Sequence, residues 1–168
     1  MQEMVIYGVS FDLLGKQPIV LLKTADGNKF LPIWIGHPEA AAILLKLQNQ
    51  SPPRPMTHDL FTDVLGQLDA KIVRITVTEL RDNTFYAQIT LAQDGEEVEV
   101  DSRPSDAIAL AIRAEAPIFA ADRVIEESGI EFDGEETTEE EMVDEFRKFL
   151  ENVSPDEFAI ADEPEEES

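Results

Sequence analysis

Two blocks of alternating or β-favouring residues predict most of the strands. The first block covers Glu3–Leu14, Pro18–Thr24 and Lys29–Ile35. Its last two stretches are separated by "ADGN" (Ala25–Asn28), where Asp-Gly tolerates the positive φ angles of a tight hairpin turn. Pro32 has no N–H to donate to a neighbouring strand, so the third strand should lie at an edge or contain a bulge.

The second block predicts another three-stranded meander. Its stretches are Lys71–Leu80, Thr84–Gln93 and Glu97–Ser102. In the first of them, one face of the expected strand carries Ile72, Arg74, Thr76 and Thr78, and the other carries Val73, Ile75, Val77 and Glu79. A short seventh strand is expected at Ala116–Ala120.

Helical spacing of apolar residues separates and follows these blocks. The helices are expected at Glu39–Gln48, His58–Leu68, Asp106–Ala114 and Asp122–Gly129. The second helix has one apolar stripe (Leu60, Val64, Leu65 and Leu68), whereas the third is apolar almost all round. Thr57 and Ser105 are predicted as the N-caps of these two helices. The order of elements predicts an α+β fold with mostly antiparallel sheets and three to four packed helices.

The negative charge lies mainly in the last quarter of the chain. The 168 residues have a net charge of -23. Residues 129–168 contain 17 acids and 2 bases, which gives -15, and the remainder carries -8. We therefore expect a domain at residues 1–130 and an acidic linker with a C-terminal amphipathic helix at 131–168. That helix, at Glu139–Val153, is expected to dock on the body, on a neighbouring subunit or on a separate partner.

Composition excludes several classes of protein. The chain has no cysteine, so it has no disulfide, thiolate metal site or cysteine nucleophile. No apolar run approaches the roughly 18 residues of a membrane span, and the first residues do not read as a secretion signal. A cytoplasmic protein is expected. The acidic balance argues against a broad basic footprint for nucleic acid.

Two helix starts share an unusual order of residues. In "PPRPMTHDLFTDVLGQL" (52–68) and "SRPSDAIALAIRAEAPI" (102–118), Arg-Pro is followed by Thr or Ser and then by Asp. The N-terminus of a helix presents unpaired N–H groups and a positive dipole end to an anion. Arg54 and Arg103 would add guanidinium groups suited to phosphate. Arg54, Thr57 and Ser105 are therefore candidate phosphate-binding residues.

The same two segments carry residues for hydrolysis. His58 is a candidate general acid or base. Asp59, Asp101 and Asp106, with Asp63 as a further carboxylate, are candidate ligands for Mg²⁺ or Mn²⁺. The predicted catalytic set is His58, Asp59, Arg103 and Asp106, a mixture that suits metal-assisted phosphodiester cleavage. The alternative is purely structural: ordinary helix caps, with Arg–Asp pairs that lock the loops.

Four segments resemble the bifunctional nuclease domain family. They are "LPIWIGHPEAAAI" (31–43), "RPMTHDL" (54–60), "TFYAQI" (84–89) and "DSRPSDAIALAIRAEAPIF" (101–119). The resemblance covers about residues 4–130. It implies DNase and RNase activity on a compact α+β fold that self-associates. The motif positions that carry over are Arg54, Thr57, His58, Asp59, Arg103, Ser105 and Asp106.

Two hypotheses follow for function. The first is a metal-assisted nuclease of low sequence specificity that acts on DNA and RNA and forms a homo-oligomer. The second is a non-catalytic anion-binding or assembly module, in which the helices at 39–48 and 106–114 form a subunit interface. The first requires that the two Arg-Pro segments meet in space. A positive cleft that contains Arg54 and Arg103 would also favour it.

Overall fold

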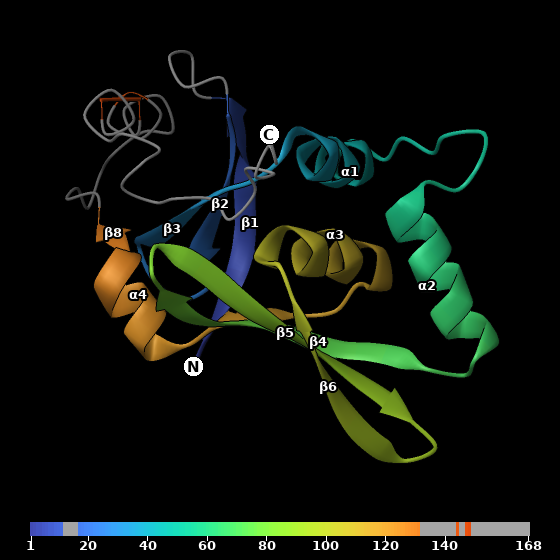
Figure 1. The fold of residues 1–168 in the computed structure, drawn as a ribbon. Helices are drawn as coiled ribbons and strands as arrows, with labels where there is room; N and C mark the ends of the chain where they lie inside the picture. The colour runs from blue at the N-terminus through green and yellow to red at the C-terminus, as the bar shows by residue number, and fades with distance from the viewer. Residues whose placement is uncertain (12–16, 132–143, 145–146, 149–168) are drawn as a thin grey trace, which may run out of the picture.

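The computed structural model describes residues 1–11, 17–131, 144 and 147–148. The strands in chain order are β1 (Gln2–Phe11), β2 (Pro18–Thr24), β3 (Lys29–Trp34), β4 (Lys71–Arg81), β5 (Thr84–Gln93), β6 (Glu96–Ser102), β7 (Ile118–Ala120) and β8 (Ile130–Glu131). The helices are α1 (His37–Leu47), α2 (Thr57–Gln67), α3 (Pro104–Ala114) and α4 (Asp122–Ser128). Figure 1 shows the helices arranged around one strongly twisted sheet. The predicted α+β class is confirmed.

All eight strands form a single sheet in the order β6-β5-β4-β7-β1-β2-β3-β8. The two predicted meanders are its two halves. The short strand β7 joins them, because it pairs antiparallel with β1 and parallel with β4. This is the one parallel pairing among the described strands.

The position of Pro32 agrees with the expected edge. It lies opposite Leu21 of β2. On the other side of β3, β8 pairs only with Lys29 and Phe30. The missing N–H of Pro32 therefore removes no hydrogen bond from a strand ladder on that side. The strand β8 itself was not predicted, and it lies across the expected domain boundary between residues 130 and 131.

Helix α3 is the centre of the packing. Its residues Ala107, Ile108 and Ala109 are completely inaccessible, and Leu110 and Ala111 are almost so. It contacts α1, α2, β4 and β5. This explains why the segment is apolar almost all round: every face meets protein. It is therefore not available as a subunit interface, and that part of the second hypothesis is wrong.

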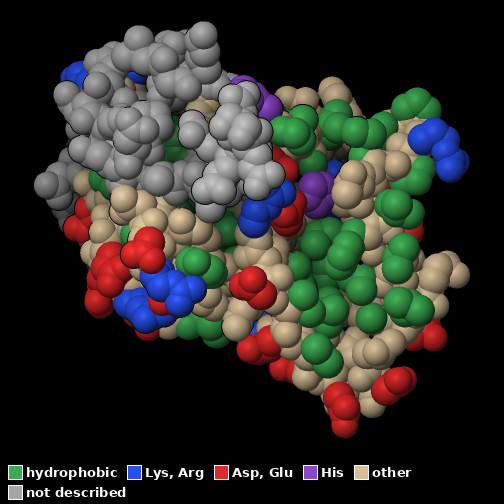
Figure 2. Space-filling view, viewed as in Figure 1, with side chains coloured by type: hydrophobic (Ala, Val, Ile, Leu, Met, Phe, Trp, Pro, Cys, Tyr) green, Lys and Arg blue, Asp and Glu red, His purple; other side chains and the backbone are tan. Residues whose placement is uncertain are grey.

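Helix α2 has the opposite character. None of its residues is buried. Three members of its predicted apolar stripe, Leu60, Val64 and Leu68, are 54%, 47% and 57% exposed. Leu65 alone of the stripe packs against the core. Figure 1 shows α2 standing at the side of the body and Figure 2 shows hydrophobic side chains gathered over α2 and the β4–β6 ribbon.

The N-caps of both helices differ from the prediction. Met56 caps α2 and Arg103 caps α3, whereas Thr57 and Ser105 already lie inside the first turn. In α3 the reason is Pro104, whose fixed φ suits the first helical position, so the helix begins one residue before Ser105. Asp59 and Asp106 consequently occupy the same third position of their helices.

The remaining sequence expectations concern the membrane, the cellular location and the C-terminal tail. No helix among the described residues is long and apolar enough to cross a membrane. The cytoplasmic location stays a prediction. Most of the predicted tail helix at 139–153 lies outside the described residues, and its docking stays a prediction.

Candidate functional site

The two Arg-Pro segments meet at the N-terminal ends of α2 and α3. His58 Nε2 lies 2.8 Å from Asp106 Oδ1. Arg103 Nε donates to the other oxygen of the same carboxylate, also at 2.8 Å. The side chain of His58 is 14% exposed and that of Arg103 is 51% exposed. One carboxylate thus holds an imidazole on its inner side and a guanidinium on its outer side.

A third helix supplies the remaining partner. Arg103 Nη2 donates to Glu39 Oε1 at 2.8 Å. Glu39 lies in the first turn of α1, and its side chain is only 13% exposed. Arg103 therefore bridges the starts of α1 and α3. We call His58, Asp106, Arg103 and Glu39 the tetrad.

The contacts within the tetrad determine the ionisation of Asp106. The hydrogen bond with His58 lowers the pKa of Asp106 most, burial opposes this, and Arg103 lowers the pKa further. Asp106 is consequently a carboxylate at neutral pH and accepts both hydrogen bonds. In the neutral imidazole, the proton is then on Nε2, and Nδ1 is the nitrogen that can accept a proton.

Asp59, one residue after His58, is bound by a different arginine. Arg113 Nε donates to Asp59 Oδ1 at 2.6 Å, and the N–H of Met56 donates to Oδ2 at 3.0 Å. Burial alone would raise the pKa of Asp59, but these hydrogen bonds and the positive charge of Arg113 outweigh it and lower the pKa. Asp59 therefore anchors the first turn of α2 to the C-terminal turn of α3.

Arg113 ties three helices together. Its side chain is 5% exposed. Besides Asp59 on α2, it binds the carbonyl oxygens of Ala109 on α3 and Ala42 on α1, at 2.8 and 3.1 Å. Sequence reasoning did not single out Arg113 or Glu39. Arg113 did carry a signal, because an arginine in an otherwise apolar helix must find partners when that helix is buried.

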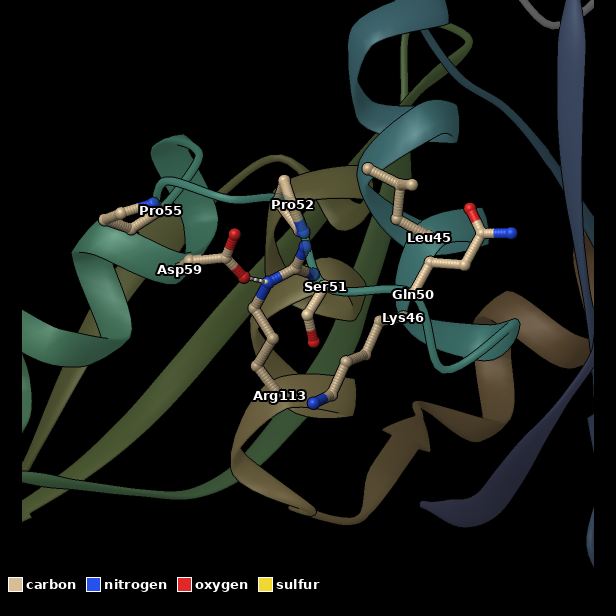
Figure 3. Close-up of a pocket in the computed structure, with 8 residues that line it drawn as sticks. All are labelled: Leu45, Lys46, Gln50, Ser51, Pro52, Pro55, Asp59 and Arg113. Carbon is tan, nitrogen blue, oxygen red and sulfur yellow. Dashed lines mark hydrogen bonds and ion pairs between the residues drawn. The ribbon is translucent and has the colours of Figure 1, made fainter.

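A pocket of about 200 Å³ opens beside this anchor (Figure 3). The polar side chains around it are Lys46, Gln50, Ser51, Asp59 and Arg113. Its remaining lining comes from Leu45, Pro52 and Pro55. It is therefore built from the end of α1, the loop before α2, the first turn of α2 and the last turn of α3.

Three predicted phosphate ligands lie outside the tetrad. Arg54 is exposed in the loop before α2 and has no ion pair among the described residues. Thr57 is exposed on the first turn of α2. Ser105 is 6% exposed, which gives its hydroxyl little access to a substrate.

The predicted metal ligands are not gathered into one cluster. Asp101 lies on β6 opposite Gln88, and Asp63 is exposed on α2. Asp59 and Asp106 each face an arginine. Within the residues that the structure describes, no three His, Asp or Glu side chains are placed to hold a metal ion. As arranged, these donors do not fit a metal centre.

The charge around the tetrad is mixed. Figure 2 shows a histidine, basic and acidic side chains together near the centre of the viewed face, with lysine and arginine elsewhere in small groups. On this face they do not form a continuous basic cleft. Recognition of a polyanion would therefore depend on a few placed cations.

Comparison with known proteins identifies the family. The bifunctional nuclease domain matches residues 20–133, which include all of the tetrad, Asp59 and Arg113. The uncharacterized protein Rv1829 of Mycobacterium tuberculosis is 39% identical over 164 residues, which cover 94% of this chain and 98% of that protein.

Plant proteins are similar over a shorter region. Bifunctional nuclease 1 of Oryza sativa subsp. indica is 29% identical over 115 residues, 66% of this chain and 35% of the plant protein. Bifunctional nuclease 1 of Arabidopsis thaliana is 29% identical over 105 residues, 60% of this chain and 32% of its own length. The shared region thus forms about a third of each plant protein. With its domain match over residues 20–133 and this similarity, the chain belongs to the bifunctional nuclease domain family.

Proposed function

We propose that this protein is a nuclease of low sequence specificity that hydrolyses phosphodiester bonds in DNA and RNA at the tetrad. The observation that carries the proposal is the 2.8 Å contact between His58 and Asp106, which brings the two Arg-Pro segments together. Family membership and the names of the plant relatives support the same reaction class.

Each tetrad side chain has a role in this proposal. Asp106 orients His58 and keeps its proton on Nε2, so that Nδ1 accepts the proton of an attacking water. The water oxygen bonds to phosphorus as the bond from phosphorus to the leaving sugar oxygen breaks, and that oxygen takes up a proton from solvent. Arg103, half exposed, pairs with the phosphate and stabilises the charge that grows on its oxygens in the transition state. Glu39 is a positioning residue, since it holds the guanidinium of Arg103 from the side of α1.

Asp59 has a positioning role in the same scheme. Its carboxylate is engaged by Arg113 and by the Met56 N–H. By fixing the first turn of α2, it keeps His58 against Asp106. A requirement for Mg²⁺ or Mn²⁺ stays a prediction, and the assay below tests it. A substrate phosphate and water would have to supply most of the ligands of such an ion.

The test is cleavage of single-stranded DNA and RNA at low salt with Mg²⁺, with Mn²⁺ and with a chelator. Wild type is compared with His58→Gln, Asp106→Asn and the matched control Asp63→Asn, an exposed acid on α2. We expect His58→Gln to lower kcat by about 10²–10⁴-fold, the usual contribution of a general base, and the control to cleave like wild type. Equal cleavage by all folded variants would exclude the tetrad as the site of hydrolysis.

A non-catalytic anion-binding module is the second candidate. The mixed charge on the face seen in Figure 2, without a continuous basic cleft, favours it over a nuclease. Absence of cleavage under every metal condition, together with salt-sensitive binding of an oligonucleotide, would support this candidate against the nuclease.

Self-association is proposed on a different surface from the one expected. The exposed apolar side chains of α2 and β6 (Leu60, Val64, Leu68, Val98 and Val100) would be covered in a homo-oligomer. Sedimentation velocity on wild type and Leu60→Gln/Val64→Gln tests this. A monomeric wild type would contradict the proposal, and an oligomer unaffected by the double change would move the interface elsewhere.

A further inference from the structure

The pocket beside Asp59 contains cationic groups that the tetrad does not use. A guanidinium has five N–H groups, and the contacts of Arg113 with Asp59, Ala109 and Ala42 occupy three of them. One N–H on each terminal nitrogen has no partner among the described residues. Because the side chain is 95% inaccessible, bulk water cannot fully solvate these donors, and an acceptor inside the pocket would satisfy them.

Lys46 adds a second cation to the same space. It lies in the last turn of α1 and lines the pocket. Its positive charge contributes to the lowered pKa of Asp59, although less than Arg113 does. No ion pair links its ammonium to another described residue. Figure 3 shows the Lys46 ammonium and the Ser51 hydroxyl on the same side of the pocket as the aliphatic stem of Arg113, with the guanidinium at the other end of that stem, beside Asp59.

The balance of charge in the pocket is unusual for this protein. Arg113 and Lys46 carry two positive charges, and Asp59 is the one acid in the lining. The pocket is therefore locally positive on a chain with 36 acids and 13 bases. This favours an anionic ligand, and Arg with Lys is the pair of side chains best suited to phosphate oxygens.

The volume and the apolar lining of the pocket narrow the range of anionic ligands that it can hold. The volume of about 200 Å³ is below the roughly 300–1,000 Å³ of pockets that enclose a drug-sized ligand. It suits one phosphate group and part of the attached sugar. Pro52 and Pro55 can meet the apolar carbons of that sugar, and Ser51 can donate to an oxygen.

The short distance between the pocket and the tetrad indicates which kind of molecule the phosphate would belong to. Asp106 and Arg113 lie on one side of α3, seven residues apart, which corresponds to two turns or about 10 Å. His58 and Asp59 are consecutive on α2 and face the tetrad and the pocket respectively. A strand bound at the tetrad would therefore need to extend by only a few nucleotides to place another phosphate in the pocket.

We propose that the Lys46–Arg113 pocket is a subsite that binds a non-scissile phosphate of a DNA or RNA strand held at the tetrad. This inference rests on the proposed nuclease function. It explains how an acidic protein could hold a polyanion, by two separate cationic points instead of a basic groove. It also makes the pocket independent of base identity, because no base edge is read there.

Binding under non-cleaving conditions tests the subsite without relying on catalysis. The full chain with chelator is titrated with a fluorescein-labelled single-stranded DNA 12-mer at several salt concentrations. The variants are Lys46→Gln and Ser51→Ala, with Lys71→Gln as the charge-matched control at an exposed lysine outside the pocket. Arg113 is left unchanged because it also holds the helices together.

The expected result is specific to a phosphate contact. Lys46→Gln should weaken binding about tenfold and reduce the slope of log K against log salt by about 0.7, the value for one phosphate contact on a single strand. Ser51→Ala should weaken binding less, and Lys71→Gln should match wild type. If Lys46→Gln and Lys71→Gln share the affinity and slope of wild type, the subsite is excluded.

A second arm separates a strand phosphate from a small anion. Inorganic phosphate and a 5′-mononucleotide are titrated against wild type and Lys46→Gln. Loss of small-anion binding in the variant, with unchanged binding of the 12-mer, would overturn the strand subsite in favour of a small-anion site.

Steady-state kinetics distinguish failure of this inference from failure of the nuclease assignment. With an active enzyme, Lys46→Gln should raise KM for the 12-mer about tenfold and leave kcat unchanged. Cleavage with wild-type KM in Lys46→Gln would reject the subsite and retain the nuclease. Binding that depends on Lys46 in a protein without cleavage would reject the nuclease and retain the strand-binding pocket.

Discussion

Helices α2 and α3 begin with closely similar residues and have opposite structural roles. An Arg-Pro pair precedes α2 and supplies the N-cap and first residue of α3, and both helices carry Asp at the third position. Yet α3 is enclosed by α1, α2 and the sheet, whereas α2 has no buried residue. The shared pattern therefore marks a helix start with an anchored carboxylate, and the residues after it decide whether the helix is buried.

Asp59 and Asp106 are bound by arginines from different parts of the chain. Asp106 is bound by Arg103 from its own segment and by His58 from α2. Asp59 is bound by Arg113 from the far end of α3. Arg54, the counterpart of Arg103, is left outside. Polar contacts therefore hold the first turn of α2, while apolar packing holds α3, and the candidate catalytic histidine lies on the more weakly held helix.

The largest expected contrast is between the two arginines of the Arg-Pro pairs. Arg103→Gln should lower kcat for single-stranded DNA by about 10²–10³-fold, the effect of losing one group that stabilises transition-state charge. Arg54→Gln should leave kcat within twofold of wild type. Equal losses would show that Arg54 also reaches the substrate and would restore the predicted symmetry of the two helix starts.

Apolar truncation should separate the helices by stability. Ile108→Ala in α3 removes a fully buried side chain and should lower the free energy of unfolding by about 3 kcal/mol. Leu60→Ala in α2, which is 54% exposed, should change it by less than about 0.5 kcal/mol. Urea denaturation measures both. A large cost for Leu60→Ala at concentrations where the protein associates would show that a partner covers α2.

Removing the anchor of α2 should have an intermediate effect. Asp59→Asn leaves the buried Arg113 without its carboxylate, and we expect a loss of about 2 kcal/mol, since Asp59 itself is partly exposed. Relative to wild type, Asp59→Asn should increase the rate of amide hydrogen exchange more in α2 than in α3. Asp63→Asn is the control on the same helix. Uniform exchange changes in both helices would mean that the anchor stabilises the whole domain instead.

Acidification should loosen the same contacts. The pKa values of Asp59 and Asp106 in the folded protein lie below the ordinary value of 3.8. The unfolded chain therefore takes up these protons first. The stabilisation is complete above about pH 4 and is lost as the pH falls through the folded pKa values. Between pH 4 and 2, Asp59→Asn/Asp106→Asn should lose stability less steeply than wild type. A parallel loss would assign the acid transition to other carboxylates.

The smallest effect should come from Gly66, near the end of α2. A Cβ added there meets no atom within 4 Å. Gly66→Ala should therefore stabilise the protein by up to about 1 kcal/mol through helix propensity. Thermal unfolding measures it. A decrease in Tm would mean that this face of α2 requires close approach by another molecule.

Local chemistry made most elements predictable. β2 and β5 have the predicted limits, and the helices begin within two residues of expectation, because apolar periodicity, Asp-Gly turns and Pro at helix starts act within a few residues of the chain. The clustering of His58, Arg103 and Asp106 was also anticipated as a requirement. The helix caps were not, since Pro104 moved the start of α3 one residue ahead of Ser105.

Long-range contacts were decided only by the tertiary structure. The parallel pairing of the three-residue β7 with β4 joins the two meanders. No residue pattern within β7 indicates which strand it will pair with. Arg113 and Glu39 entered the site because burial forces charged side chains to find partners, wherever in the sequence these lie. Local sequence was enough to predict the elements and the kinds of side chain at two helix starts. Packing around α3 decided that they form one site, and that α2 rather than α3 presents an apolar face to solvent.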